Sequence, residues 1–332
     1  SMFRGSSWDS LLEEIEIPAN VTTIGSSAFE DCVKLKSVKF LGNKITVIPS
    51  SAFKSCHSLT DIVLPDGITE IGTGAFTGKY IAPNTKPNMG AAFTSITIPA
   101  SVTTISANAF QYCRNLETII FKGTITDIGA SAFAECVSLK NIDLSNVTNY
   151  GASVFTGAGL ENVTLRGDAT YGKTVFQYCT DLKTVTFTDG SATLGDSMFS
   201  GCTSLTKVTL PNKITAIPSS LFASCSALTE VSIPETITTI GGSAFSGCSS
   251  LKSVDLGDKV TTIGAYAFQD CTSIQSINIP MNVYEIDAKG IFGGWTAEQT
   301  INFGYEGYQA FRLYGEKLLN GCAAKVNFGV TK

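Results

Sequence analysis

Residues 234–256 read PETITTIGGSAFSGCSSLKSVDL, and residues 257–279 read GDKVTTIGAYAFQDCTSIQSINI. Each line is 23 residues long, and the two agree at the Ile/Val, Thr, Ile, Gly, Ala-Phe, Cys, Leu/Ile and Val/Ile positions. Self-similarity at a period of this length is typical of a solenoid, in which each unit buries its apolar face against its neighbours. This stretch therefore predicts the fold.

The same period runs through most of the chain. It can be followed through one phenylalanine per repeat, at Phe29, Phe53, Phe76, Phe110, Phe133, Phe155, Phe176, Phe199, Phe222, Phe245, Phe268 and Phe292. Successive phenylalanines are 21 to 24 residues apart, except for one step of 34 residues between Phe76 and Phe110, which predicts an inserted loop. A cysteine follows the phenylalanine by three residues in nine of these twelve copies.

Each repeat contains short alternating runs that favour β-strands. In residues 228–233, LTEVSI, apolar and polar positions alternate toward the end, and β-branched residues suit a half-buried strand. The Ser-Ala-Phe-Ser-Gly-Cys piece is too short for an independent helix, so we expect one helical or 3₁₀ turn there. The prediction is a repeat solenoid: a right-handed coil, mainly β, of about 12–13 repeats of 23 residues, with a parallel ladder on its concave face and a shorter one behind.

The alternation also predicts which side chains of one repeat are inside. We expect exposed side chains at Thr229, Glu230 and Ser232. We expect buried side chains at Leu228, Val231, Ile233, Ile237, Ile240, Phe245 and Cys248.

Three segments follow from where the repeat begins and ends. Residues 1–17 are interpreted as a truncated or N-terminal repeat edge, and residues 18–303 as the solenoid, with an insertion at 78–92. Residues 304–332 depart from the repeat and include a predicted final strand at residues 325–328. Because terminal repeats need a cover, we interpret residues 304–332 as a C-terminal cap.

The repeat unit Ile-Pro-x-x-Val-Thr-x-Ile-Gly-x-x-Ala-Phe-x-x-Cys-x-x-Leu-x-x-Val resembles the BspA-like (Treponema pallidum-type) leucine-rich repeat, roughly from Leu12 to Phe303. Twelve periodic copies make the resemblance specific for the fold. It implies a surface or secreted protein of host-associated anaerobic bacteria or some protists, with adhesion to host matrix proteins or to other cells. Because one scaffold carries many ligands, this implication concerns only the class of function.

Composition argues against two classes of partner. The net charge is −5, and a nucleic-acid binder would show a basic stripe. The sequence contains no run of 18 apolar residues, so we expect no membrane insertion. It also shows no secretory signal, so the extracellular or cell-surface localisation that we expect rests on the resemblance.

The ten cysteines do not have the spacing of a metal or disulfide framework. Zinc would require Cys-x-x-Cys pairs or histidine partners, and the one histidine is His57, expected on a solvent-facing turn. In-register cysteines would hold their Cβ atoms about 4.8 Å apart, longer than the roughly 3.5–4.5 Å of a disulfide. We therefore predict a ladder of nine buried, reduced cysteines. Cys322 lies outside it, as a cap core residue or a reactive thiol. We expect no catalytic residues, metal or cofactor, and no enzyme.

The remaining candidate is the exposed column of the main ladder, where hydroxyl, amide and charged side chains recur. The candidate ligand-binding residues of this concave face are Asp143, Thr164, Thr186, Thr209, Ser232, Asp255, Asn278, Lys207 and Glu230. Thr and Ser also simply suit a solvated strand, and that alternative stays open. The insertion adds Tyr80, Ile81 and Met89 as a second candidate, against the alternative of a tolerated surface loop.

The sequence thus predicts a non-enzymatic adhesion or protein-binding module. Its partner would be a host matrix or cell-surface protein, and the module itself a monomer. The alternative is a structural spacer with no ligand of its own. Few aromatic residues lie on the exposed column, which disfavours both carbohydrate stacking and a protein interface rich in hot spots.

Overall fold

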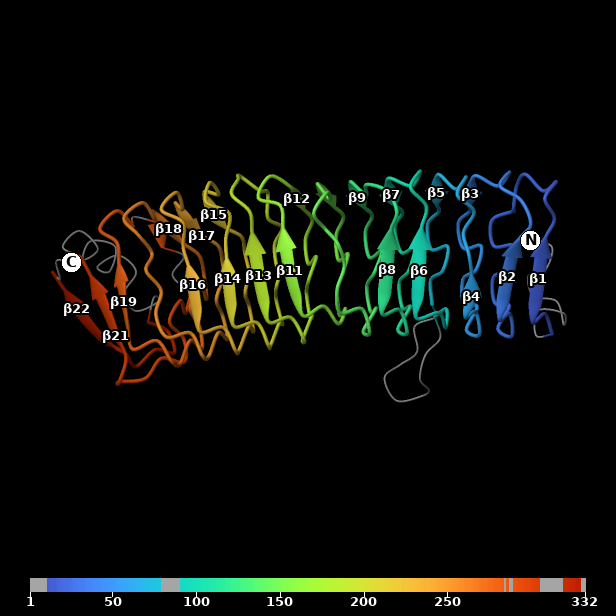
Figure 1. The fold of residues 1–332 in the computed structure, drawn as a ribbon. Coiled ribbons are helices and arrows are strands. Elements are labelled where there is room, and N and C mark those ends of the chain that lie inside the picture. The colour runs from blue at the N-terminus through green and yellow to red at the C-terminus, as the bar shows by residue number, and fades with distance from the viewer. Residues whose placement is uncertain (1–10, 79–89, 284, 287–288, 305–318, 330–332) are drawn as a thin grey trace. The chain divides into compact units, whose positions relative to one another are not determined.

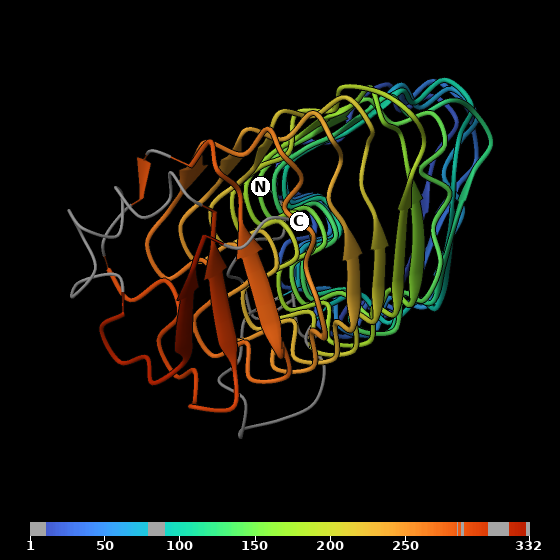
Figure 2. The same ribbon diagram turned by 90° about the vertical axis from the view of Figure 1, so that its left-hand side faces the viewer.

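The protein is a parallel β-solenoid of about twelve turns, roughly 23 residues apart, as predicted (Figure 1). This computed structural model describes residues 11–78, 90–283, 285–286, 289–304 and 319–329. Figure 2, turned by 90°, shows each turn as one loop of the coil, with the longer strands of the front ladder on one side of the loop and short strands behind. The chain forms two compact units, Ser1–Glu161 and Asn162–Lys332.

In the first unit the front ladder is divided in two. Three strands pair in parallel: β1 (Glu14–Ile17), β2 (Ser37–Phe40) and β4 (Asp61–Ile62). Two more form a separate parallel pair: β6 (Ser95–Ile98) and β8 (Thr118–Phe121). The back ladder consists of β3 (Val47–Ile48), β5 (Glu70–Ile71), β7 (Thr104–Ile105), β9 (Asp127–Ile128) and β10 (Asn149–Tyr150).

The second unit repeats this arrangement. Its front strands are β11 (Asn162–Leu165), β13 (Thr184–Phe187), β14 (Lys207–Thr209) and β16 (Glu230–Ser232), followed by a separate group of β19 (Ser276–Ile279), β21 (Thr300–Phe303) and β22 (Lys325–Phe328). Its back strands are β12 (Thr170–Tyr171), β15 (Ala216–Ile217), β17 (Thr239–Ile240), β18 (Thr262–Ile263) and β20 (Glu285–Ile286). The predicted final strand is therefore present as β22, and it pairs with β21. That residues 304–332 form a cap stays a prediction.

Equivalent residues of neighbouring repeats stand opposite one another, as the period predicts. Val163 pairs with Val185, which pairs with Val208, which pairs with Val231, and all four side chains are buried. Of the residues expected inside one repeat, only Ile233 differs, because it is half-buried. It lies one residue beyond the end of β16, where the ladder no longer fixes its direction.

The prediction of a helical or 3₁₀ turn around each phenylalanine is wrong. No helix occurs among the described residues, and, except at Gly78, the residues two before and two after the phenylalanine are left-handed, such as Ser243 (φ 54°) and Gly247 (φ 75°) around Phe245. A right-handed helix cannot pass through left-handed positions. Instead the amides of these three residues donate to carbonyls of the next turn, those of Ala265, Ala267 and Gln269, at 2.7–2.9 Å.

The phenylalanines and cysteines fill the core as two columns. Within each unit successive Phe rings stack with centroids 5.3–6.2 Å apart. The thiol of Cys248 donates to the carbonyl of Phe222 in the preceding turn at 3.1 Å, and six other cysteines repeat this contact at 3.1–3.3 Å. Cysteine therefore supplies a small apolar body and a hydrogen-bond donor at the same position.

Candidate binding face

Six of the nine predicted face residues lie together on one ladder of the second unit. Thr164, Thr186, Thr209 and Ser232 are exposed and in direct register on β11, β13, β14 and β16. Lys207 and Glu230 stand opposite each other in the neighbouring exposed column. The alternation of the sequence thus placed these side chains on the correct side of the strands.

The threonines of the solenoid fall into two groups. One group holds successive turns together: the hydroxyl of Thr206 donates to the carbonyl of Lys183 at 3.1 Å, and that of Thr229 donates to the carbonyl of Thr206 at 3.3 Å. The hydroxyls of Thr164, Thr186 and Thr209 have no hydrogen-bond partner among the described residues. The face hydroxyls therefore remain available to a ligand, unlike those that join the turns.

The two predicted aspartates, Asp143 and Asp255, do not lie on strands. Asp143 Oδ1 accepts a hydrogen bond from the amide of Ser145 at 3.0 Å, and Asp255 Oδ1 accepts one from the amide of Gly257 at 3.0 Å. The hydrogen bonds from Ser145 lower the pKa of the Asp143 carboxyl. Both side chains close local turns, an arrangement that competes with ladder pairing, so they are not members of a continuous face.

Asn278 is placed as predicted, exposed on β19, but its amide has a partner. Asn302 Nδ2 donates to Asn278 Oδ1 at 2.9 Å, and Asn327 Nδ2 donates to Asn302 Oδ1 at 3.0 Å. This amide ladder joins β19, β21 and β22, which form a sheet separate from that of the face threonines. Tyr80, Ile81 and Met89 lie outside the described residues.

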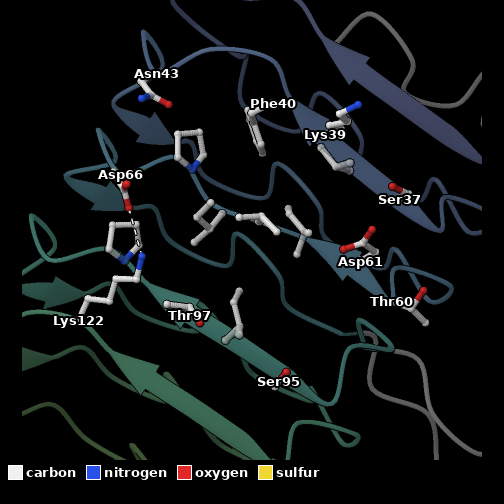
Figure 3. Close-up of a pocket in the computed structure, with 17 residues that line it drawn as sticks. Ser37, Lys39, Phe40, Asn43, Thr60, Asp61, Asp66, Ser95, Thr97 and Lys122 are labelled. Atoms are coloured by element: carbon white, nitrogen blue, oxygen red, sulfur yellow. Dashed lines mark hydrogen bonds and ion pairs between the residues drawn. The ribbon is translucent and has the colours of Figure 1, made fainter.

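The residues predicted from the sequence do not include those of a groove in the first unit. The groove lies where β4 and β6 face each other without pairing, and we call it the Val63 groove (Figure 3). Its volume is about 620 Å³, and it is lined by residues 37–40, 60–66, 95–97 and 99, with Asn43 and Lys122. The signal in the sequence was the 34-residue step, because β4 and β6 belong to the repeats before and after that step.

The Val63 groove combines an exposed apolar side chain with charged groups. Val63 is 75% exposed. Lys122 Nζ lies 3.4 Å from Asp66 Oδ1, an ion pair that connects two turns at one end of the groove (Figure 3), and Lys39 pairs with Glu16 at 3.0 Å. Asp61 is exposed and has no ion-pair partner among the described residues.

The thiols are not arranged for nucleophilic chemistry. All nine ladder cysteines are free and buried, and burial raises the pKa of Cys113 and of Cys225 to about 12. Such thiols hold little thiolate, the reactive form. His57 is half-buried, with Nδ1 inside, instead of facing solvent as predicted. In the part of the chain that the structure describes, His, Cys, Asp and Glu side chains form no group of three or more suited to a metal ion.

Comparison with known families agrees with the fold. The BspA type leucine-rich repeat region matches residues 3–88, 79–187 and 169–295, in six copies. The chain belongs to this family. Among the residues that the structure describes, there is no helix with the length and hydrophobicity needed to cross a membrane.

Solved structures show the same fold. A leucine-rich repeat protein from Bacteroides ovatus is 28% identical over 94% of this chain and 83% of its own, with a TM-score of 0.75. A leucine-rich repeat protein from Eubacterium ventriosum is 22% identical over 85% of this chain and 82% of its own, with a TM-score of 0.56. The pneumococcal vaccine antigen PcpA is 16% identical over 98% of this chain and 91% of its own, with a TM-score of 0.57. Curated proteins gave no match.

Proposed function

We propose that this protein is a non-enzymatic adhesion module that binds a protein partner through the exposed side of its front ladder. The observation that carries the proposal is the in-register column of Thr164, Thr186, Thr209 and Ser232, whose hydroxyls have no hydrogen-bond partner among the described residues. Rigid repeat scaffolds bind ligands on such ladders because the strands hold the side chains at fixed spacing. Thr and Ser hydroxyls both donate and accept hydrogen bonds.

The proposed partner is a host matrix or cell-surface protein, and the proposed location is the cell surface or the extracellular space. Membership of the BspA-type family supports both, since its members are expected to be surface or secreted proteins. One protein of the same fold is described as a vaccine antigen. We propose a monomer in which the ladder face is free to bind.

The test is binding of the purified chain to a panel of purified extracellular-matrix proteins by surface plasmon resonance. The double variant Thr186→Arg/Thr209→Arg places two long cations on the face without changing the core. The control is Ala216→Arg, at an exposed position of the back ladder. We expect the double variant to weaken binding at least about tenfold, as expected when bulky charges block an interface, and the control to bind like the parent.

The opposite result would favour a structural spacer. If the parent binds no protein of the panel, or if the double variant binds as tightly as the control, the face has no ligand of this class. Circular dichroism of all three proteins checks that each is folded.

A further inference from the structure

We propose that the Val63 groove binds an extended peptide segment of the partner protein, one that carries a Lys or Arg and, two residues away, an aliphatic side chain. This inference rests on the proposed protein-binding function and adds a second contact region, on the first unit. The basic residue would lie over Asp61 and the aliphatic residue over Val63.

The strand topology explains why an extended ligand fits. β4 pairs with β2, and β6 pairs with β8, but β4 and β6 do not pair with each other. The facing edges of two strands therefore border the groove, and Figure 3 shows Asp61 on one side and Ser95 and Thr97 on the other. An extended peptide that aligns with a strand edge obtains backbone hydrogen bonds, while its alternate side chains enter the groove.

The apolar contact comes from Val63. In the exposed column of the front ladder the neighbouring positions carry Lys39 on β2 and Thr97 on β6, both polar, and the next position carries Ile120 on β8, which is 50% exposed. Val63 occupies this column at 75% exposure, and it lies within the groove and not on a flat surface. An aliphatic side chain of the ligand would remove apolar area from water here, which favours binding.

The charged residues of the groove indicate that the ligand side chain should be cationic. Four ionised side chains line the groove, and three of them, Lys39, Lys122 and Asp66, are already in ion pairs. Lys39 pairs with Glu16, which is not a lining residue, and Lys122 pairs with Asp66. Asp61 is the fourth, and its carboxylate has no ion-pair partner among the described residues. A cationic side chain would pair with it, whereas an acidic one would be repelled.

The spacing follows from the burial pattern at β4. Asp61 begins this strand and Val63 directly follows its last residue; both are exposed while Ile62 between them is half-buried, so the alternation of the strand continues through Val63. Positions i and i+2 of a strand are about 6.6 Å apart, and an extended ligand has the same repeat. A basic residue at i and an aliphatic residue at i+2 therefore match Asp61 and Val63, whereas adjacent residues would point to opposite sides.

The probe is a fluorescein-labelled, end-blocked peptide Ser-Thr-Lys-Thr-Leu-Thr-Ser, titrated with the full chain at low salt and followed by anisotropy. Two control peptides change one property each: Ser-Thr-Glu-Thr-Leu-Thr-Ser reverses the charge, and Ser-Thr-Lys-Leu-Thr-Thr-Ser makes the two residues adjacent. We expect a Kd on the order of 0.1–1 mM for the probe, typical of a short peptide, and at least about threefold weaker binding of each control.

Variants of the protein complete the test. Asp61→Asn should weaken binding of the probe about threefold, the range of one exposed ion pair, and Val63→Ser about fivefold. The matched controls are Asp189→Asn and Val137→Ser, which make the same changes at exposed positions elsewhere and should leave the Kd unchanged.

The inference is overturned if the probe does not bind, if the charge-reversed peptide binds equally well, or if Asp61→Asn and Val63→Ser behave like their controls. Self-association that depends on Val63, with no peptide binding, would also overturn it, because the groove would then serve a second copy of the chain. Failure here is distinct from failure of the proposed function: matrix-protein binding that is still weakened by Thr186→Arg/Thr209→Arg would leave the adhesion face in place.

Discussion

Replacement of Phe245 by alanine tests the core of the repeat most directly. Its ring is fully buried, and its two faces stack on Phe222 and Phe268 with centroids 5.6 Å and 5.4 Å away. The alanine variant would leave a space between two rings that the backbone hydrogen bonds of the stack hold in place. Because the turns cannot close this gap, we expect a cavity to remain.

The magnitude follows from the buried ring. Removing a phenyl group takes roughly 120 Å² of apolar surface out of the core, which is about 3 kcal/mol at 25 cal/mol/Å². Loss of two stacked ring contacts adds about 1–2 kcal/mol. The free energy of unfolding should therefore fall by about 4–5 kcal/mol, at the upper end of the range for buried phenylalanine.

The assay is urea denaturation followed by far-ultraviolet circular dichroism, with native-state hydrogen exchange to locate the loss. Since each turn contacts only its neighbours, exchange should accelerate in the turns around residue 245 before distant ones. The control is Phe328→Ala, the same substitution at a residue that is 40% exposed on β22, for which we expect a loss below about 2 kcal/mol. A loss below about 1 kcal/mol for Phe245→Ala, or one equal to the control, would refute this account of the core.

Three other predictions concern the columns and turns. Burial raises the pKa of Cys113 and Cys225 from 9.0 to about 12, so unfolding above pH 9 releases their protons. The free energy of unfolding should therefore fall from pH 9 toward pH 12, by about 1.4 kcal/mol per thiol at pH 10. Urea midpoints that do not change between pH 8 and pH 10 would contradict this. Trp295→Phe should cost about 1–2 kcal/mol in thermal or urea unfolding, because it leaves the carbonyl of Phe268 without the indole donor. Ser243→Gly should be neutral or stabilising, whereas Ser243→Val should cost about 1–2 kcal/mol at this left-handed position; equal unfolding midpoints for the two variants would count against backbone strain there.

The repeating core was predictable because the same residue types recur at each position of many repeats. A single Leu-x-x-Val-x-Ile segment does not show which of its side chains are buried, but its recurrence every 23 residues indicates the buried side of each strand. Val163, Val185, Val208 and Val231 are in register for this reason. Ile233 was misplaced because the end of a strand depends on its hydrogen-bonded neighbours, which the period alone does not describe.

The conformation of the turns was harder to predict, because it is stabilised by hydrogen bonds to the neighbouring turn. Ser243 in the left-handed region is stabilised by its amide hydrogen bond to Ala265, which no local preference of serine indicates. A weaker signal was present two residues after the phenylalanine, where glycine recurs at Gly157, Gly201, Gly247 and Gly294. Glycine at a recurring position favours a positive φ over a helix.

The candidate face was predictable where the strands continue and not where they stop. Asp143 and Asp255 were assigned to the ladder by alternation, but each is followed two residues later by the amide that its carboxylate binds. The groove at Val63 depends on two strands that fail to pair, and this is a property of the assembled turns.

The cysteine column supplies hydrogen bonds within the core. The carbonyl of Phe245 accepts the amide of Cys248 and the thiol of Cys271, so both of its lone pairs are used. Without the thiol one of them would be buried and unsatisfied, which is costly. Trp295 occupies the cysteine position of the last phenylalanine repeat, and its indole N–H makes the same bond to the preceding phenylalanine carbonyl, that of Phe268, at 2.9 Å. Tryptophan keeps the hydrogen bond and loses the sulfur, so a donor at this position does not have to be a thiol.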